Sequence, residues 1–368
     1  MKRVIISGGG TGGHIFPAIA IADTIKRKYP DVQILFVGAE GRMEMDRVPR
    51  AGYEIVGLPI KGLNRKNPLK NIPVAVNLVK SLILAKRTIK RFNPDIAIGV
   101  GGYASAPVLK EAQKAGIPTL IQEQNSYPGV TNKLLAKHVN KICVAYPDME
   151  QFFPKEKIIL TGNPIRKDLE HMNVTKEEAI YHFRLPSQSD KILLVLGGSL
   201  GARTINESVK SHLIDLAEAG VTLIWQTGKS YIDEARDAID RVPQLHCHVT
   251  DFIERMDYAY VAADLVISRA GALSISEICL LRKPAILVPS PNVAEDHQTK
   301  NAKALSMRGA ADLITDAEAN EKLIPEAIEA LDRPKQLEDM GNAAGKLATP
   351  NAAEHIVRQV EIVLGLNS

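Results

Sequence analysis

The sequence predicts an α/β protein with two doubly wound, Rossmann-like domains. Strands rich in Val and Ile alternate with glycine turns and helical patterns, as in a parallel sheet covered by helices. A strand that runs into a glycine cluster occurs twice, at residues 3–13 and again at residues 191–201. The 368 residues exceed one ordinary domain and suit two. In such sheets, ligands bind beyond the carboxyl ends of the strands.

Composition and charge are those of a soluble globular protein. Hydrophobic residues make up 45% of the chain and charged residues 24%, with a formal net charge of +4. Cys143, Cys247 and Cys279 lie beside apolar residues without metal-ligand spacing, so we expect reduced thiols in a cytosolic protein. We expect neither a signal peptide nor a membrane span, because no apolar run approaches about 20 residues.

The first strand, predicted over residues 3–7, runs into the glycine cluster at residues 8–13. Residues 15–25 have helical spacing, so the cluster lies at a helix N-terminus, which is typical of a phosphate-binding loop. The cluster also satisfies G-x-G-x-x-G, but a dinucleotide site needs an acidic residue closing the second strand. That strand, residues 33–37, closes on glycine and alanine instead. The pattern therefore disfavours NAD.

No acidic residue occurs between residues 55 and 94, where basic and apolar side chains are interleaved. One interpretation is a core helix, with Leu78, Leu82 and Ile89 at helical spacing and a solvated basic face. The favoured one is contact with anionic lipid, because the apolar residues exceed one buried stripe and cations flank them. Nucleic acid is disfavoured because no aromatic residues are interleaved to stack on bases. The basic residues are Lys61, Arg65, Lys66, Lys70, Lys80, Lys86, Arg87, Lys90 and Arg91.

The alternation continues through the rest of the chain, with a hinge at Asn163-Pro164, where proline stops regular structure. The turns at residues 101–105 and 122–126 follow neighbouring strands and so belong to one edge. The last helix, predicted over residues 352–364, has an apolar stripe. The other strands are predicted at residues 54–58, 96–100, 119–121, 141–145, 157–160, 191–196, 222–225, 245–249, 265–267 and 285–288.

The segment from Ser268 to Glu277 has small residues where a strand turns into a helix. We expect Gly271 to adopt backbone angles closed to other residues, while short side chains let a phosphate approach the first helical turn. Glu277 could accept two hydrogen bonds from a ribose diol. The alternative is an ordinary helix start with serine capping and a glutamate that complements the helix dipole.

Eight ordered motifs together resemble the MurG family over the whole chain. These transferases move N-acetylglucosamine from its UDP derivative to lipid I and so form lipid II in bacterial peptidoglycan synthesis. The motifs are GGGTGGHIFPA at the start, RMEMDRVP from Arg42, GGYASAP from Gly101, QEQNSYPGVTNK from Gln122, GNPIR from Gly162, LGGSLGAR from Leu196, RAGALSISE from Arg269 and the helix start containing Gln298.

The resemblance implies a GT-B fold, in which two Rossmann-like domains face each other across a cleft. Residues 1–163 would form an acceptor-binding, membrane-facing domain, with the C-terminal helix at residues 351–368 packing back on it. Residues 164–350 would bind the UDP-sugar. The protein would lie on the cytoplasmic face of the cell membrane as a peripheral protein, with roles in cell shape and division.

The resemblance also implies particular site residues. His14 and Glu123 are the candidate catalytic bases, and Gly10 and Tyr103 would contact the acceptor. Glu277 would take the ribose hydroxyls, which agrees with its chemistry, and Ile253 would contact uracil through its backbone. The full donor set is Thr11, Gly12, Gly13, Asn125, Arg166, Ser199, Ile253, Ala272, Leu273, Ser274, Ile275, Ser276, Glu277 and Gln298.

The implied reaction inverts the anomeric carbon, because an α-linked donor gives a β-linked product. It needs one base and a stabilised leaving diphosphate. The chain has no D-x-D pair of the kind that holds a metal in many sugar-nucleotide enzymes, so we expect helix N-termini to replace the metal and no cofactor. The position of Gln298 is the least secure, because the turn before it is variable in such proteins.

Three other function classes stay in view. An NAD-linked oxidoreductase would leave the second glycine loop unexplained. A UDP-sugar epimerase shares the architecture and the donor site, but has no use for the basic, apolar segment. A non-catalytic membrane scaffold would use that segment and would not need the glycine loops.

Overall fold

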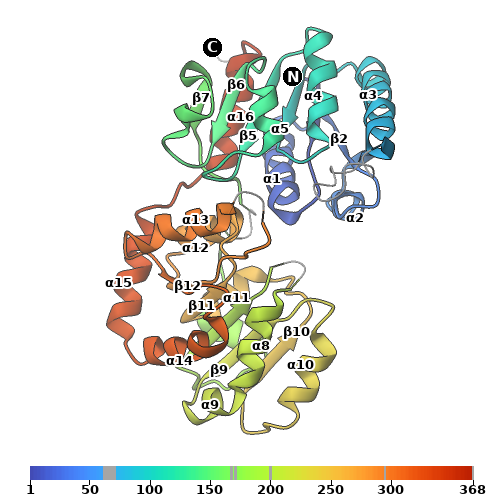
Figure 1. Ribbon diagram of the computed structural model, residues 1–368. Helices are drawn as coiled ribbons and strands as arrows, with labels where there is room; N and C mark the ends of the chain where they lie inside the picture. Colours follow the sequence, from blue (N-terminus) through green and yellow to red (C-terminus); the bar gives the residue numbers. More distant parts are fainter. Residues whose placement is uncertain (61–71, 166–168, 170–171, 199–200, 294–295, 367–368) are drawn as a thin grey trace. The chain divides into compact units, whose positions relative to one another are not determined.

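Parallel strands pair into two separate sheets, one in each half of the chain (Figure 1). The computed structural model describes residues 1–60, 72–165, 169, 172–198, 201–293 and 296–366. The chain divides into two compact units: unit 1 is Met1–Arg166 with Asn351–Ser368, and unit 2 is Lys167–Pro350. The predicted class, α/β with two Rossmann-like domains, is confirmed.

Unit 1 contains a seven-stranded sheet in the order β3-β2-β1-β4-β5-β6-β7. Its strands are β1 (Arg3–Ser7), β2 (Gln33–Ala39), β3 (Glu54–Leu58), β4 (Ile96–Gly99), β5 (Thr119–Glu123), β6 (Lys141–Val144) and β7 (Ile158–Leu160). Its α-helices are α1 (Gly12–Lys28), α2 (Glu44–Arg50), α3 (Ile72–Phe92), α4 (Ser105–Lys114), α5 (Val130–Leu135) and α16 (Ala352–Val363). The chain leaves β3 at one edge and returns beside β1, so the sheet reverses its order between β1 and β4.

Alternate residues of β1 enter two different cores, as the period of a strand requires. Val4 and Ile6 pack with α1 and α16, while Ile5 packs on the other face with α3, α4 and α5. Ile356 and Val360 of α16 are fully buried in the first of these cores. The last helix of the chain therefore belongs to unit 1.

Helix α3 buries a stripe of residues that includes Ser81, Ala85 and Ile89, and it exposes apolar residues beside that stripe. Ile89 is buried, but Leu78 is 43% exposed, so the alternative interpretation of a core stripe through Leu78, Leu82 and Ile89 is wrong at Leu78. Val79 and Ile83 are also exposed, at 56% and 50%. Periodicity identifies a helical face but not how far along it a neighbouring helix reaches. Residues 61–71, the start of the predicted lipid-binding segment, lie outside the described residues.

Unit 2 contains a six-stranded sheet in the order β10-β9-β8-β11-β12-β13. Its strands are β8 (Ile192–Leu196), β9 (Thr222–Gln226), β10 (Cys247–Thr250), β11 (Leu265–Ser268), β12 (Ala285–Leu287) and β13 (Asp312–Leu313). Its helices are α7 (Lys176–His182), α8 (Arg203–Ser211), α9 (Leu213–Glu218), α10 (Ile232–Ile239), α11 (Met256–Ala262), α12 (Ala272–Leu280), α13 (His297–Ser306), α14 (Ala319–Leu331) and α15 (Pro334–Gly345). The order reverses between β8 and β11.

Ligands of doubly wound sheets bind where the strand order reverses, beyond the carboxyl ends of the strands. In unit 1 that point is flanked by the loops after β1 and β4, and in unit 2 by those after β8 and β11. All the predicted glycine loops and the Ser268–Glu277 segment lie there. In the part of the chain that the structure describes, no helix is long and apolar enough to cross a membrane.

Candidate functional site

The loops after β1, β4 and β5 are linked by hydrogen bonds into one edge of unit 1. Ser105 Oγ, at the start of α4, donates to the carbonyl oxygens of Ser7 at 2.7 Å and Gly101 at 2.9 Å. Gln124 Nε2 donates to Val100 O at 2.8 Å. Gly102 has φ +83°, and a Cβ there would collide with the backbone of the first glycine loop. The first glycine loop and the loop after β4 therefore pack against each other directly.

Glu44, on α2, holds the first glycine loop through hydrogen bonds to the backbone. Its carboxylate is 1% exposed and accepts hydrogen bonds from the backbone N–H groups of Gly10 and Ala39, each at 2.9 Å. A Cβ on Gly9 would collide with this carboxylate. Sequence reasoning quoted Glu44 within the RMEMDRVP motif but gave it no role. A signal was present, because an acid between two methionines needs polar partners if it is buried.

His14 lies in the first turn of α1, beside the loop that follows β4. Its Nδ1 is 3.3 Å from Thr11 Oγ1, and a Cβ added to Gly101 would lie 2.8 Å from His14 Nε2. The imidazole therefore lies against the backbone of the loop that follows β4. Tyr103, in that same loop, is 56% exposed. The structure thus brings His14 and the loop of Tyr103 together at one edge.

Glu123 closes β5 and has both carboxylate oxygens occupied. Oε1 accepts from the backbone N–H of Asn125 at 3.0 Å, and Oε2 accepts from Gly129 N–H at 3.1 Å and Asn132 Nδ2 at 2.9 Å. Burial raises the pKa of Glu123, and these hydrogen bonds act in the opposite direction. With 2% exposure, the carboxylate shapes the loop that carries Asn125.

The helix start predicted in unit 2 is present, with Ala272 as the first residue of α12 and Gly271 as its N-cap. The expected special backbone at Gly271 is wrong: φ is −68° and ψ 144°, which any residue can adopt. A Cβ there would make only an ordinary contact, 3.8 Å from Ser274 Oγ. Glycine at this position therefore leaves space beside the first turn.

Glu277 lies in the second turn of α12 and is partly exposed. Its Oε2 accepts a hydrogen bond from Tyr260 OH at 2.9 Å, and Tyr260 is fully buried. A fixed phenol therefore orients the carboxylate. Leu273 and Ser274 are partly exposed, while Ile275 is buried on the inner face of the helix. Ser276 Oγ donates to Ala272 O within the helix at 2.9 Å.

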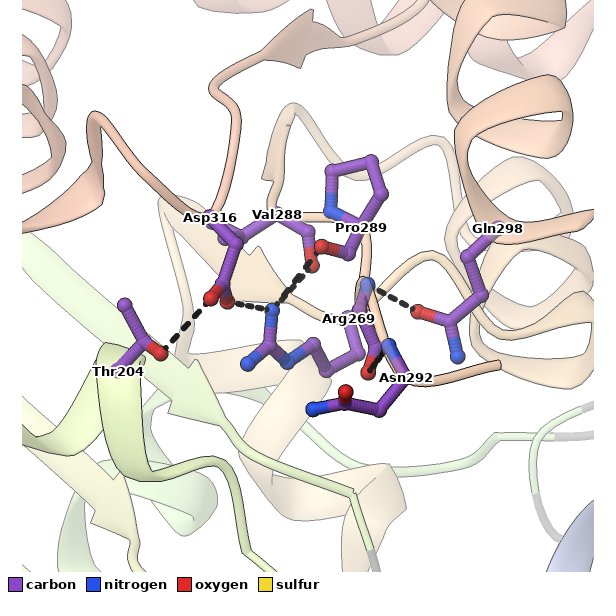
Figure 2. Close-up of polar contacts among 8 residues, drawn as sticks. Thr204, Arg269, Val288, Pro289, Asn292, Gln298 and Asp316 are labelled. Carbon is purple, nitrogen blue, oxygen red and sulfur yellow. Dashed lines mark hydrogen bonds and ion pairs between the residues drawn. The ribbon is translucent and has the colours of Figure 1, made fainter. Parts of the chain in front are cut away.

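Gln226 joins two loops at the end of β9. Its Nε2 donates to Gly198 O at 3.1 Å, and its Oε1 accepts from Ile253 N–H at 2.9 Å. The N–H of Ile253 thus has a partner within unit 2, so a base contact through that N–H requires Gln226 to move. Gln298 lies near the start of α13, and its Oε1 accepts from Ser290 N–H at 2.9 Å (Figure 2).

The predicted site residues thus fall into two groups, one in each unit. Ile253, Gln298 and residues 272–277 lie at the carboxyl edge of the second sheet, and residues 10–14, Tyr103, Glu123 and Asn125 at that of the first. Arg166 and Ser199 lie outside the described residues. Among the residues described, no group of His, Cys, Asp and Glu could hold a metal ion.

Two family descriptions match the chain. Glycosyltransferase family 28 N-terminal domain matches residues 4–144, and glycosyltransferase family 28 C-terminal domain matches residues 192–356. Together they cover more than half of the chain and include both carboxyl edges.

Similar proteins come from several bacteria. A Porphyromonas gingivalis protein is 61% identical over 358 residues, which is 97% of this chain and 94% of that protein. A Christiangramia forsetii protein is 51% identical over 359 residues, covering 98% of this chain and 97% of that protein. Both are named UDP-N-acetylglucosamine--N-acetylmuramyl-(pentapeptide) pyrophosphoryl-undecaprenol N-acetylglucosamine transferase.

Solved structures show the same fold. The crystal structure of Acinetobacter baumannii MurG superposes with a TM-score of 0.75 at 29% identity, covering 98% of this chain and all (100%) of that one. A Neisseria meningitidis UDP-GlcNAc 2-epimerase bound to UDP-GlcNAc has a TM-score of 0.68 at 16% identity, covering 98% of this chain and 99% of that one. The second likeness concerns the fold alone.

Proposed function

The chain belongs to glycosyltransferase family 28, and from this premise we propose that it transfers N-acetylglucosamine from UDP-N-acetylglucosamine to the muramyl sugar of lipid I. The product is lipid II, a precursor of peptidoglycan, so the protein acts in cell-wall biogenesis. The observation that carries the proposal is 61% identity, over 97% of the chain, to a protein named for this transfer.

The reaction is a single in-line displacement. The acceptor hydroxyl attacks the anomeric carbon from the face opposite the diphosphate, and the bond from that carbon to the UDP oxygen breaks as the glycosidic bond forms. A base takes the hydroxyl proton, and UDP leaves as an anion. The enzyme therefore has to provide one proton acceptor and a set of donors for the leaving diphosphate.

We assign the base to His14. Its support is geometric: the imidazole lies at the edge of unit 1 beside the exposed loop of Tyr103. Glu123, the other candidate, is a poorer choice because both of its oxygens already accept hydrogen bonds. Glu123 is better suited to holding the loop that presents Asn125 to the donor sugar, and Gly10 and Tyr103 contact the acceptor.

We assign the nucleotide to unit 2, Lys167–Pro350. The first turn of α12 offers backbone N–H groups and the positive end of a helix dipole to the diphosphate. We assign Arg166 and Ser199 to the same group on the family resemblance alone. Glu277 binds the ribose hydroxyls, Ile253 contacts uracil, and Gln298 binds the sugar. The contact of Tyr260 with Glu277 supports the ribose assignment, because it fixes the carboxylate before the ligand arrives.

We also propose that unit 1 binds the cytoplasmic surface of the membrane through α3. Val76, Val79 and Ile83 are exposed apolar residues on this helix, at 50%, 56% and 50%. Exposed Lys80, Lys86, Arg87, Lys90 and Arg91 flank them. Exposed aliphatic residues bordered by cations fit the interface of an anionic lipid leaflet. A lipid-linked acceptor would then reach the enzyme from that surface.

Radiolabelled UDP-N-acetylglucosamine tests the function directly. Incubation with a lipid-linked muramyl acceptor is expected to place the label in a lipid-linked disaccharide, and omission of the acceptor should abolish incorporation. Conversion of the donor into a C2 epimer without acceptor would contradict the transferase and favour the epimerase alternative.

A further inference from the structure

Arg269 connects the segments that follow four strands of the second sheet (Figure 2). It comes directly after β11, and its side chain is 14% exposed. Nη1 donates to Val288 O at 3.2 Å and Pro289 O at 3.1 Å, both after β12. The same nitrogen pairs with Asp316 Oδ1, after β13. Asp316 Oδ2 in turn accepts from Thr204 Oγ1 at 3.0 Å, on α8 after β8.

The charge of Arg269 is matched within the protein. Asp316 is its ion-pair partner and is itself only 22% exposed. A largely buried pair of opposite charges contributes little net field to a ligand, but removal of either partner leaves an uncompensated charge. What the guanidinium contributes is geometry, because the planar group holds Nη1 within hydrogen-bond distance of three acceptors on two segments. A lysine ammonium is shorter and lacks this planar group.

The segment held by Arg269 leads to Gln298. Ser290 lies between Pro289 and Pro291, which have no N–H group, and its own N–H donates to Gln298 Oε1 at 2.9 Å. Asn292 N–H reaches back to Ser290 Oγ at 3.4 Å. One end of this short segment is therefore fixed by the guanidinium and the other by the Gln298 amide. A shift at Arg269 would move Gln298.

We infer that Arg269 is a positioning residue of the donor site: it holds the segment after β12 so that Gln298 meets the sugar of the UDP-linked donor. This inference rests on the proposed function. Arg269 lies next to the helix start that would bind the diphosphate, but in this role it makes no direct contact with that group. Its effect passes through Val288, Pro289 and Ser290.

Kinetics of Arg269→Lys and Arg269→Gln separate positioning from charge. If Arg269 positions the segment, both variants should raise the KM for UDP-N-acetylglucosamine by about 10- to 100-fold, the size expected for lost hydrogen bonds to a charged group. The turnover number at saturating donor and the KM for the acceptor should stay near wild type. Normal kinetics for Arg269→Lys, with loss only for Arg269→Gln, would overturn the inference in favour of a charge effect.

Milder variants keep the test valid if the Arg269 variants fold poorly. Thr204→Val removes only the hydrogen bond to Asp316 and should raise the same KM by a smaller factor. Combining it with Asp316→Asn should give less than the product of the single effects, because both act on one network. Independent effects, or no effect, would contradict the inference.

A matched control and the wild-type enzyme complete the design. Arg333→Lys alters an exposed arginine of unit 2, between α14 and α15, that pairs with exposed Glu329, so its kinetics should be unchanged. Absence of transfer by the wild-type protein would instead disprove the proposed function. The two failures are therefore distinguishable.

Discussion

The loops at the carboxyl edge of each sheet are held by charged side chains of their own unit. These side chains are anionic in unit 1 and cationic in unit 2. In unit 1, the buried carboxylates of Glu44 and Glu123 accept hydrogen bonds from backbone N–H groups of the loops. In unit 2, the guanidinium of Arg269 donates to backbone carbonyl groups of the loop after β12. The first arrangement uses up N–H groups, and the second uses up carbonyl oxygens.

This difference bears on which edge suits a diphosphate. An anion is bound by backbone N–H groups and helix N-termini. The first glycine loop has the sequence of a phosphate-binding loop. However, the N–H of Gly10 already donates to the carboxylate of Glu44 and is therefore not available to a phosphate. Among the described residues of unit 2, no carboxylate accepts a hydrogen bond from the N–H groups of Ala272, Leu273 or Ser274 in the first turn of α12. The comparison therefore supports the proposal that the nucleotide binds unit 2 and that the acceptor and its base belong to unit 1.

The largest expected effect is that of His14→Ala on proton transfer at the edge of unit 1. Loss of a general base typically costs ~10² to 10⁴ in rate, so the turnover number should fall by that order. UDP affinity, which the comparison places in unit 2, should change little in a calorimetric titration. A raised acceptor KM with normal turnover at saturation would break the assignment and make Glu123 the next residue to test.

Glu44→Gln tests the support beneath the first glycine loop. The amide keeps the shape but offers one oxygen where the carboxylate offers two, so one backbone N–H loses its acceptor. Turnover should fall by about 10- to 100-fold, the equivalent of one charged hydrogen bond, while UDP affinity is preserved. Asp46→Asn, an exposed change on the same helix, is the control and should be silent. Weaker UDP binding by Glu44→Gln would contradict the division between the units.

Glu277→Ala tests the opposite edge. The variant should raise the KM for UDP-N-acetylglucosamine by about 10- to 100-fold. With this variant, the KM for 2′-deoxy-UDP-N-acetylglucosamine should be little higher than the KM for the natural donor. If the variant and the deoxy donor each raised the KM and their factors multiplied, the carboxylate would not contact the 2′-hydroxyl. Tyr260→Phe is a useful second variant, because it removes only the hydrogen bond that orients Glu277 and should give a smaller effect.

Charge reversal on α3 should weaken membrane binding more modestly. Each of Lys80→Glu and Lys86→Glu should cost about 1 kcal/mol, roughly fivefold in affinity for anionic vesicles in a flotation assay. Activity on a short-chain, soluble acceptor should persist. Lys346→Glu, an exposed change in unit 2, should leave vesicle binding unaltered. Equal loss of activity on both acceptors would show that these side chains support the fold instead.

The smallest effect is expected from EDTA. If the first turn of α12 with Ser199 and Arg166 neutralises the leaving diphosphate, activity should survive exhaustive chelation. Activity that disappears and returns with a stoichiometric divalent metal would contradict this mechanism.

Much of the fold could be predicted because it depends on local sequence. The limits of β1 and the first residue of α12 follow from short apolar runs bounded by glycine and serine. Strand β10 was expected at residues 245–249 and spans Cys247–Thr250, and β13, with two residues, was not expected at all. A strand that short has no periodicity to detect.

The supports of the site could not be predicted, because they depend on contacts between distant residues. Glu44 and Gly10 are separated by 34 positions, and Arg269 and Asp316 by 47. The charge of each of these residues indicates that it needs polar partners, but it does not say which distant residue the partner is. Which apolar residues of α3 are exposed depends on where α4 packs against it, and helical spacing alone does not show this.

Amide chemical-shift mapping with UDP tests the central claim most directly. UDP lacks the N-acetylglucosamine group, so it probes the nucleotide site alone in the isotopically labelled full-length protein. The account predicts large shifts for Ala272, Ser274 and Glu277, saturating with UDP concentration, and small shifts for Gly10 and Thr11. Larger saturating shifts in the first glycine loop than in α12 would contradict the assignment of the nucleotide to unit 2.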